Sequence, residues 1–505
     1  MNEPRTQLPS TTDIVIAGGG PAGSTIARLL SELGFRVVVC EKRRFPRYQI
    51  GESLTPQILP VLDFLGVRAR IEAAGFLQMA GHTVCWGTAH PRTSYYSPDH
   101  SRRGFQAWRE EFDSLLLTHA REGGALVFEQ CAVKDIQLTD TGMSVSTSSG
   151  PIAAEFFIDA SGRAGVFARR TLRQRDAVFQ TLAVTGYWRG ATGPVGIDFA
   201  NTLLETYENG LVWSVPLHNG LRNVTLLIDW QLGKRIRRSG LPAFYHAELP
   251  QAPYVSQFLR HAQLAGPLRA IDATWHTAKT FAGAQFLLVG DAGMFVDPLS
   301  SEGVHKAMAS AITGAAVVNT ILRRPAMRSH ALKFYEESQQ QTYSAYYQQS
   351  AQYYGEEQRW LHVPFWQRRT QNQSRVLSSE SRVPSPEFRV LSPEFQASTQ
   401  IISQLAIAPG VEIEQRPAIE GPFVELREAV VSPRHPRGVR FLDNMCIPVL
   451  VRLVDQHHAV ADIMQAYLQR PEGRYCQPEA VRQLLARLYQ EGMLIATGPD
   501  ESRSD

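Results

Sequence analysis

Cysteine is scarce in this sequence, and its arrangement argues against a cross-linked fold. The five cysteines are Cys40, Cys85, Cys131, Cys446 and Cys476, an odd number without a CxxC pair. A disulfide framework needs an even set at close spacings, and a structural zinc site needs paired ligands. We therefore expect free or buried thiols in a reducing cytoplasm and no metal site.

Long apolar runs and a charge excess are also missing. The N-terminal segment is polar (MNEPRTQLPSTTD), and no run approaches the roughly eighteen apolar residues of a membrane-spanning helix. The 51 basic and 48 acidic side chains nearly balance, whereas nucleic-acid-binding proteins carry a concentrated basic surplus. We expect a cytoplasmic protein with no membrane and no nucleic-acid partner.

A glycine-rich turn stands out near the N-terminus. Residues 18–23 read GGGPAG between an apolar strand and a helix. In a GxGxxG turn, Gly18 makes the bend, Gly20 lets the backbone approach a pyrophosphate, and Gly23 allows close helix packing. Glu41 ends the following strand, where a ribose-binding acid belongs. This βαβ unit, with a strand at Ile14–Ala17, a helix at Ser24–Leu33 and a strand at Arg36–Cys40, predicts a dinucleotide-binding sheet.

Three later motifs resemble those of the flavoprotein monooxygenases and imply FAD as the dinucleotide. They are Arg109-x-x-Phe112-Asp113, the DASGR segment from Asp159 to Arg163, and Gly290-Asp291-Ala292 followed by Asp297-Pro298. In that family the arginine lies beside the flavin, and the aspartate of the Gly-Asp pair, here Asp291, holds the ribityl chain. A helix expected from about Gly303 would point its free N–H groups at the flavin ring. Some relatives carry a covalent flavin link at an aspartate in this region, which leaves Asp297 open to that role.

Three further segments resemble the flavin-dependent halogenases. They are GESLTP at 51–56, WSVP at 213–216 and PFWQRR at 364–369, and the likeness covers about residues 10–370. We expect FAD contacts at Gly18, Gly20, Ala22, Gly23, Glu41, Lys42, Arg43, Glu52, Ser53, Arg109, Val133, Asp159, Asp291, Pro298, Gly303 and Val304.

One departure from the halogenase pattern bears directly on the chemistry. Halogenases place a lysine a few residues before a Trp-Gly pair, here Trp86-Gly87, to capture or orient hypohalous acid. Met79 or its neighbour Gln78 occupies that position, and no lysine occurs between Lys42 and Lys134. A thioether or an amide lacks the ammonium that this chemistry needs.

Two more departures from the halogenase pattern also argue against halogenation. Leu211 replaces the first tryptophan of the WxWxIP motif, which is thought to keep the flavin hydroperoxide away from substrate. Ser300 replaces the glutamate of tryptophan-type halogenases. Glu302 stands where backbone N–H groups hold the halide, and a carboxylate there repels an anion.

These departures favour hydroxylation by a flavin C4a-hydroperoxide. Glu302 and His305 are the candidate catalytic residues, either of which would act as general base on an indole or phenol. A packing or capping role for His305, and an ion-pairing or substrate-orienting role for Glu302, are the alternatives. The reductant is either NAD(P)H or reduced flavin from a partner reductase, since no second GxGxxG appears.

The expected fold is α/β (α+β), with several parts. An FAD-binding Rossmann-like domain of the aromatic hydroxylase/halogenase type should occupy residues 1–175, with a substrate-domain insertion near 80–108 and a return segment at 276–325. An antiparallel substrate sheet should cover 176–275, and an aromatic-rich helical segment 326–380. A linker over 381–404, which repeats SPEF, should lead to a small winged-helix-like domain at 405–505. That domain resembles peptide-recognition modules; a stabilising or dimerising helical cap is the alternative.

The leading functional hypothesis is an FAD-dependent monooxygenase that hydroxylates an electron-rich aromatic ring. The sequence most resembles the peptidyl-tryptophan hydroxylases of tryptophylquinone cofactor biogenesis, which implies a peptide or protein substrate. The alternatives are a halogenase whose lysine is Lys306 or Lys279, an FAD-dependent reductase, and a non-catalytic protein that keeps FAD structurally.

Overall fold

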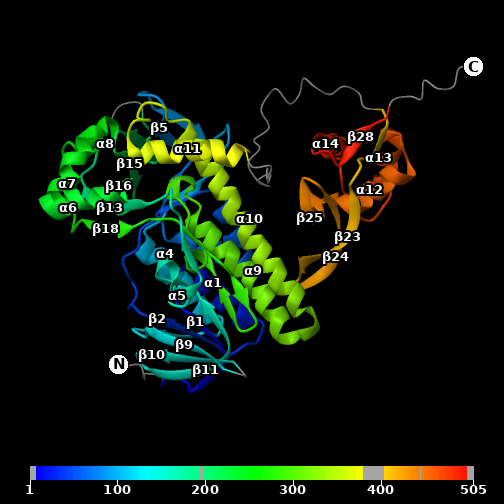
Figure 1. The fold of residues 1–505 in the computed structure, drawn as a ribbon, viewed down its shortest axis with the longest axis horizontal. Coiled ribbons are helices and arrows are strands. Elements are labelled where there is room, and N and C mark those ends of the chain that lie inside the picture. Colours follow the sequence, from blue (N-terminus) through cyan, green and yellow to red (C-terminus); the bar gives the residue numbers. More distant parts are fainter. Residues whose placement is uncertain (1–6, 140–141, 194–196, 379–402, 444, 498–505) are drawn as a thin grey trace, which may run out of the picture. The chain divides into compact units, whose positions relative to one another are not determined.

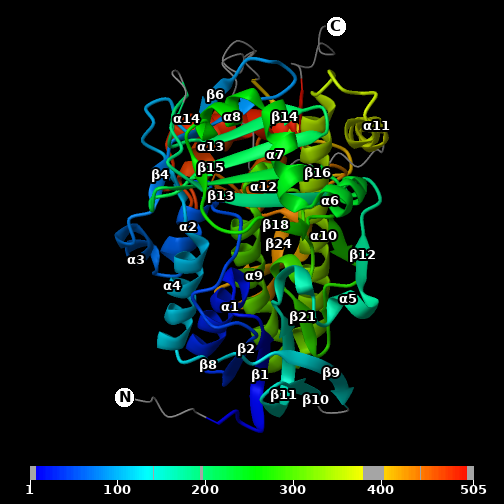
Figure 2. The same cartoon turned by 90° about the vertical axis from the view of Figure 1, so that its left-hand side faces the viewer.

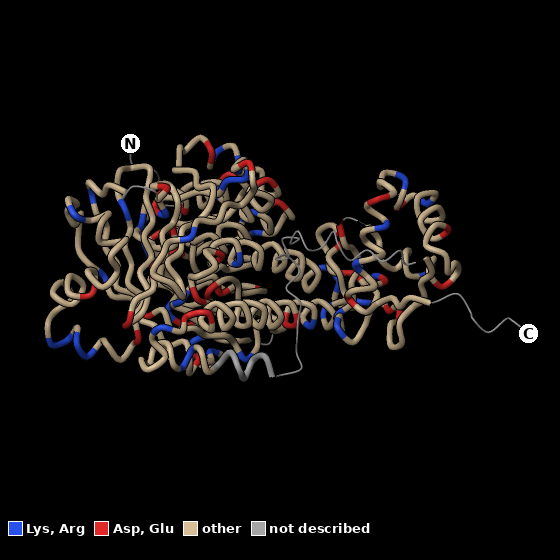
Figure 3. The backbone as a smooth tube through the Cα atoms, turned by 90° about the horizontal axis from the view of Figure 1, so that it is seen from above, with Lys and Arg blue, Asp and Glu red and all other residues tan. Residues whose placement is uncertain are grey.

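The chain folds into two compact units, residues 1–379 and 380–505. The computed structural model describes residues 7–139, 142–193, 197–378, 403–443 and 445–497. Residues 381–402 of the predicted linker, which include its SPEF repeat, lie outside these residues. None of the described helices combines the length and the apolar character that crossing a bilayer requires. Positions of basic and acidic residues are intermixed along the backbone (Figure 3).

A parallel sheet forms the base of the first unit. Its order is β20-β21-β11-β1-β2-β8, and every neighbouring pair except β20–β21 is parallel. The bounds are β1 Thr11–Ala17, β2 Val37–Glu41, β8 Leu126–Glu129, β11 Gly150–Asp159, β20 Ala282–Gly283 and β21 Phe286–Leu288. Strand β10 Gly142–Thr147 pairs with β11, and β9 Val133–Thr139 pairs with β10. The buried Val-rich and Ile-rich runs of β1 and β2 explain their central position.

Helices pack on this sheet (Figures 1 and 2). They are α1 Pro21–Glu32, α4 Arg109–Glu122 and α9 Gly303–Arg323. Helix α1 begins three residues before the predicted Ser24, because Pro21 fits the first helical turn, where no N–H partner is required. Small buried residues such as Gly314 let α9 lie against α1 and β21, since a Cβ there would meet Leu287 Cδ2 at 2.8 Å.

A second, mostly antiparallel sheet stands over the first one. Its order is β17-β13-β16-β15-β14-β5-β6, with β18 also paired to β13. The bounds are β5 Gly81–Cys85, β6 Arg92–Tyr95, β13 Thr181–Arg189, β14 Thr202–Tyr207, β15 Gly210–Pro216, β16 Leu221–Asp229, β17 Gln263–Leu264 and β18 Arg269–Asp272. Short helices α6 Gly233–Ser239, α7 Leu241–Glu248 and α8 Pro253–Leu259 cover its outer face.

Aromatic side chains tie the two sheets to the last helices of the unit. Helix α10 spans Arg328–Gly355 and α11 spans Pro364–Ser378. Tyr354 and Trp366 are buried with Trp275 in one cluster, and Arg369 lies 3.7 Å from the Phe365 ring centroid. These aromatic side chains thus serve core packing.

The second unit has its own hydrophobic core. A three-stranded antiparallel sheet, β23 Glu412–Glu420, β24 Phe423–Ser432 and β25 His435–Val439, precedes helices α12 Ile447–Gln456, α13 Val460–Leu468 and α14 Pro478–Gln490. Strand β28 Leu494–Ala496 pairs with β22 Leu405–Ile407. The sequence pattern did not predict the β23–β24 hairpin or α12. The domain boundaries remain a prediction, as does peptide recognition by this unit.

Candidate FAD and substrate site

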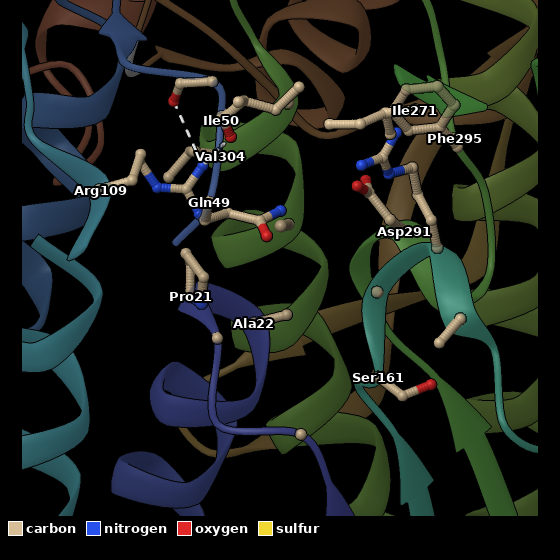
Figure 4. Close-up of a pocket in the computed structure, with 18 of the residues that line it drawn as sticks. Pro21, Ala22, Gln49, Ile50, Arg109, Ser161, Ile271, Asp291, Phe295 and Val304 are labelled. Atoms are coloured by element: carbon tan, nitrogen blue, oxygen red, sulfur yellow. Dashed lines mark hydrogen bonds between the residues drawn. The ribbon is translucent and has the colours of Figure 1, made fainter. Parts of the chain in front are cut away.

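A cavity of about 630 Å³ lies in the first unit, with walls from both sheets (Figure 4). Pro21 and Ala22, at the start of α1, lie between Arg109 on one side and Ser161 with Asp291 on the other. Ile271 and Phe295 also line it. The cavity is long and mixed in character, which suits a dinucleotide with an aromatic ring system at one end.

The glycine-rich turn is built for close backbone approach. Gly18 has φ of 102°, and a Cβ there would lie 2.6 Å from Ala160 O. A Cβ on Gly23 would lie 1.9 Å from Gly18 O, so this residue can only be glycine. No side chain caps the N-terminus of α1, which leaves its first N–H groups available to a phosphate beside the cavity-lining Gly20.

Glu41 is fixed at the end of β2. Its carboxylate accepts hydrogen bonds from Gly19 N and Arg43 N, each at 2.8 Å. The side chain is only 4% exposed and lines the cavity. Two backbone donors hold the carboxylate still, so its remaining lone pairs can receive the hydroxyls of a ribose.

Most of the expected cofactor residues converge on this cavity. Those that line it are Gly18, Gly20, Ala22, Glu41, Lys42, Arg43, Glu52, Ser53, Arg109, Val133, Asp291, Pro298, Gly303 and Val304. Gly23 does not line it, because it packs α1 against the turn.

Asp159 is the second exception, and its surroundings give it a structural role. One carboxylate oxygen accepts from Ser161 N and Oγ, and the other from Phe167 N and Ala168 N, at distances of 2.6–3.2 Å. The side chain is fully buried and holds the loop after β11 in place. Residues 160–164 of that loop line the cavity, so Asp159 acts on the site through the backbone.

Arg109 anchors the opposite wall. It forms a buried ion pair with Asp113, Nε to Oδ1 at 2.9 Å, and donates from Nη1 to the carbonyls of Ile50 and Gly51 (Figure 4). The carboxylates of Asp113 and Glu52 raise the pKa of Arg109, although burial opposes them. The arginine therefore stays charged beside the cavity and positions the 50–52 segment.

The segment before α9 completes the cofactor side. Gly290 has φ of 59°, and Asp291, next in the chain, accepts from Lys306 Nζ at 3.0 Å. Lys306 is buried and also donates to Met294 O. Pro298, Gly303 and Val304 line the cavity at the start of α9. The uncapped α1 turn, the fixed Glu41 and this helix start together fit FAD.

Asp297 is held tightly by protein groups. Its carboxylate accepts from Tyr354 Oη at 2.8 Å and from Leu299 N at 3.1 Å. Burial raises its pKa despite these bonds and the nearby Arg369. Asp297 also lines the cavity, so a covalent flavin link at this residue would have to displace the Tyr354 hydroxyl.

A buried carboxylate, Glu52, lines the cavity and is bound by a tyrosine of the antiparallel sheet. Glu52 is 4% exposed and accepts from Tyr187 Oη and Gly51 N. Burial raises the pKa of Glu52, and that of Tyr48 to about 12. Arg269 stacks over Tyr48 at 4.1 Å. Tyr48, Tyr187 and Arg269 carry no motif signal, and only the fold brings them to Glu52.

Met79 lies in an unexpectedly polar site. It ends β4 Leu77–Met79 and is fully buried. Ser53 Oγ lies 3.5 Å from its Sδ atom, and the hydroxyls of Thr202 and Tyr96 each lie 3.9 Å away. Met79, one of the two candidates for the halogenase lysine position, is thus a thioether with three hydroxyls around it. Gln78, the other candidate for this position, is exposed.

Glu302 and His305 lie together beside this site. Glu302 accepts a 2.5 Å hydrogen bond from Thr55 Oγ1, and His305 Nδ1 lies 2.9 Å from the other carboxylate oxygen. Glu302 also raises the pKa of Tyr96, after the larger effect of burial. Neither residue lines the cavity itself, although Ser301 and Gly303 on either side of Glu302 do. Their catalytic role remains a prediction.

Leu211 is fully buried in the aromatic cluster with Trp86 and Trp366, while Trp213 lines the cavity two residues later. Leu211 therefore takes the position of the missing tryptophan, and its buried neighbours pack around this smaller side chain. Lys279 is exposed, and Lys306 is bound by Asp291. Among the described residues, Lys42 is the lysine that lines the cavity.

Together, the parallel dinucleotide-binding sheet, the covering antiparallel sheet and the cavity between them define an FAD-dependent oxidoreductase. A family model described as "FAD binding domain" matches residues 11–350. The tryptophan 2-halogenase of Chondromyces crocatus is 38% identical, and the match covers 65% of this chain and 65% of that enzyme. The flavin-dependent halogenase armH4 of Armillaria mellea is 35% identical over 65% of this chain and 69% of its own. The chain belongs to the FAD-dependent halogenase and aromatic hydroxylase family, and its cofactor is FAD.

Solved structures support the same fold. CmlS, a flavin-dependent halogenase, matches 97% of this chain and 96% of its own with a TM-score of 0.78 at 26% identity. Residues 1–379 are about three-quarters of the chain, so this match extends into the second unit. The peptidyl tryptophan dihydroxylase QhpG, essential for tryptophylquinone cofactor biogenesis, matches 95% of this chain and 99% of its own with a TM-score of 0.67 at 24% identity, a likeness of fold.

Proposed function

We propose that this chain is an FAD-dependent monooxygenase that hydroxylates an electron-rich aromatic ring, a tryptophan of a peptide or protein. The observation that carries the proposal is Met79, a buried thioether at the position where the halogenase pattern has its lysine. Reduced FAD supplies the activation of O2 when bound. Without an amine at residue 79 the chain has no group there to hold hypohalous acid, so the oxygen atom itself is delivered to the ring.

The protein groups near Met79 suit proton transfer from an aromatic substrate. Glu302 is 5% exposed, and its carboxylate is oriented by Thr55 and lies next to His305. An electron-rich ring becomes a better nucleophile when a base accepts its N–H or O–H proton. We assign that task to Glu302, with His305 positioning the carboxylate.

The reductant is the second part of this proposal. The described residues contain one glycine-rich turn of the dinucleotide type, at Gly18–Gly23, and it serves FAD. A reductase that delivers reduced flavin, or NAD(P)H that binds transiently, would supply the electrons. A cytoplasmic location suits both donors and remains an expectation.

Halogenation is the second candidate, and the relatives favour it. The tryptophan 2-halogenase of Chondromyces crocatus and several Armillaria mellea halogenases are 30–38% identical to this chain. Lys306 is the buried lysine closest in sequence to the predicted catalytic residues. Its Nζ, however, already donates to Asp291 and to Met294 O, which leaves it poorly placed to bind an oxidant.

One experiment separates the two candidates. Purified protein is supplied with reduced FAD, O2 and bromide, and with free indole and tryptophan-containing peptides as substrates. A product that gains one oxygen atom supports hydroxylation. A product with the two-line isotope pattern of bromine would refute it and establish halogenation. A product that gains neither atom, with reduced FAD consumed, would overturn both candidates.

A further inference from the structure

Strand β18, Arg269–Asp272, forms part of an exposed edge of the antiparallel sheet. It pairs with β13 on one side, and within the described ranges no strand pairs with its other side. Ala270 and Asp272 are both exposed. An open edge of this kind presents backbone N–H and C=O groups to any extended chain that comes alongside.

The register identifies which groups face outward. Ala273 N donates to Thr181 O at 2.9 Å, so Ala273 belongs to a hydrogen-bonded pair with β13. Since such pairs alternate in an antiparallel ladder, Ile271 also faces β13 with its backbone groups, and Ala270 and Asp272 face away. The carbonyl of Asp272 already accepts from Arg163 Nη1 at 2.9 Å, so an added strand bonds to the backbone groups of Ala270 and displaces Arg163 if it also bonds at Asp272.

The two faces of β18 open onto different cavities. Ile271 lines the FAD cavity, whereas Ala270 and Asp272 line a second cavity of about 510 Å³ on the opposite face of the strand. Apolar side chains in that cavity come from Leu182, Trp230 and Ile236. A strand added beside β18 would send alternate side chains into the two cavities.

The second cavity is basic. Arg175 and Arg237 line it, and α6 also carries Lys234, Arg235 and Arg238 with no acidic residue. Asp272, the one acid in the lining, is paired with Arg175. Arg235 pairs with Glu248, while Arg237 and Lys234 have no acidic partner among the residues that the structure describes. The excess of positive charge favours acidic side chains on this face.

We infer that β18 binds the substrate as an added β-strand. The occupant is an extended acidic peptide whose target aromatic residue lies opposite Ile271 and enters the FAD cavity. Its two neighbours lie opposite Ala270 and Asp272 and enter the basic cavity, where acidic side chains meet Arg237. This inference rests on the proposed function, and it adds a recognition rule: the target aromatic residue has acidic residues directly before and after it.

Three synthetic peptides of equal length test the rule, using full-length protein loaded with FAD. The first has a central Glu-Trp-Glu, and the second has Lys-Trp-Lys. The third is the first peptide with a methyl group on the backbone nitrogen of the glutamate expected opposite Ala270. Fluorescence anisotropy measures binding. We expect the first peptide to bind about fivefold to tenfold more tightly than either of the others, because each of those loses a hydrogen bond or ion pairs of about 1–1.4 kcal/mol.

Ala270→Pro is the matched protein variant. It removes an outward N–H and leaves the pairing of β18 with β13 intact, because proline is tolerated at sheet edges. Ala270→Val keeps the N–H and serves as control. We expect Ala270→Pro to raise KM for the Glu-Trp-Glu peptide about fivefold to tenfold, while free indole turns over as in the wild type.

The outcomes distinguish this inference from the proposed function. Equal binding of the methylated and unmethylated peptides, or equal KM values for Ala270→Pro and Ala270→Val, would overturn strand addition even if free indole is hydroxylated. Bromination of indole would overturn the proposed function, yet the binding measurements would still decide whether β18 takes a peptide strand.

Discussion

The substitution Met79→Lys tests the chemistry most directly, because it puts an amine at the halogenase lysine position. Met79 is fully buried. An ammonium moved there from water loses several kcal/mol of solvation. Three hydroxyls, on Ser53, Thr202 and Tyr96, lie 3.5–3.9 Å from Sδ. Hydrogen bonds to a charged group contribute about 1.5–3 kcal/mol each. Two or three of them together, about 3–9 kcal/mol, offset most or all of that loss, so the variant should stay folded.

We expect Met79→Lys to gain bromination. The assay uses reduced FAD, O2, bromide and indole, and mass spectrometry gives the ratio of brominated to oxygenated product. Met79→Leu has nearly the same volume and no amine, so it should give the oxygenated product alone. Far-ultraviolet circular dichroism and the flavin absorbance of each purified variant check folding and cofactor loading.

Two results would refute this reasoning. Bromination by the wild type would mean that residue 79 does not decide the reaction. A folded, FAD-loaded Met79→Lys that still hydroxylates and never brominates would mean that the absent amine is not what separates the two activities.

Three further predictions concern residues with defined partners. Glu302→Gln keeps an acceptor for Thr55 but removes the base. The stopped-flow kcat for indole should therefore fall about 10²-fold to 10³-fold, with FAD affinity unchanged. An unchanged kcat would exclude Glu302 as the base. Asp159→Asn replaces a carboxylate oxygen that accepts from the Phe167 and Ala168 N–H groups by an amide NH2, which is a donor. The free energy of unfolding in urea should therefore drop by about 2–4 kcal/mol. A variant as stable as the wild type would contradict the role of Asp159 in holding the loop. Burial raises the pKa of Glu205 from 4.5 to about 7, so the folded protein keeps a proton that the unfolded chain has released. The stability from this group is present below about pH 4.5 and is lost as the pH rises to 7, by about 3 kcal/mol at most. The stability of Glu205→Gln should not show this decrease between pH 4.5 and 7. The same pH dependence of the free energy of unfolding in urea for the variant and the wild type would disprove the prediction.

Sequence motifs predict most of the residues that meet at the cavity. Gly18, Glu41 and Asp291 follow strands of one parallel sheet, so their spacing along the chain is enough to bring them to the same edge. Asp159 shows the limit of that reasoning. A motif gives the residue type, but only the folded loop shows that Ser161 and Phe167 saturate its carboxylate.

The surroundings of Met79 are harder to predict because the neighbouring side chains come from distant segments. Ser53, Tyr96 and Thr202 meet at Met79 from three separate parts of the chain, and no spacing rule connects them. The β23–β24 hairpin escaped prediction because its outer residues include many charged side chains, which hide the alternation of a half-buried sheet.

The three hydroxyls around Met79 also have a genetic consequence. The methionine codon AUG becomes the lysine codon AAG by a change of its second base alone. The new lysine side chain enters a site that already contains acceptors for an ammonium. The mutant protein therefore does not first need compensating mutations to remain folded. Two different reactions on one scaffold would then be neighbours in sequence space, and a laboratory selection for halogenated product could cross between them in a single step.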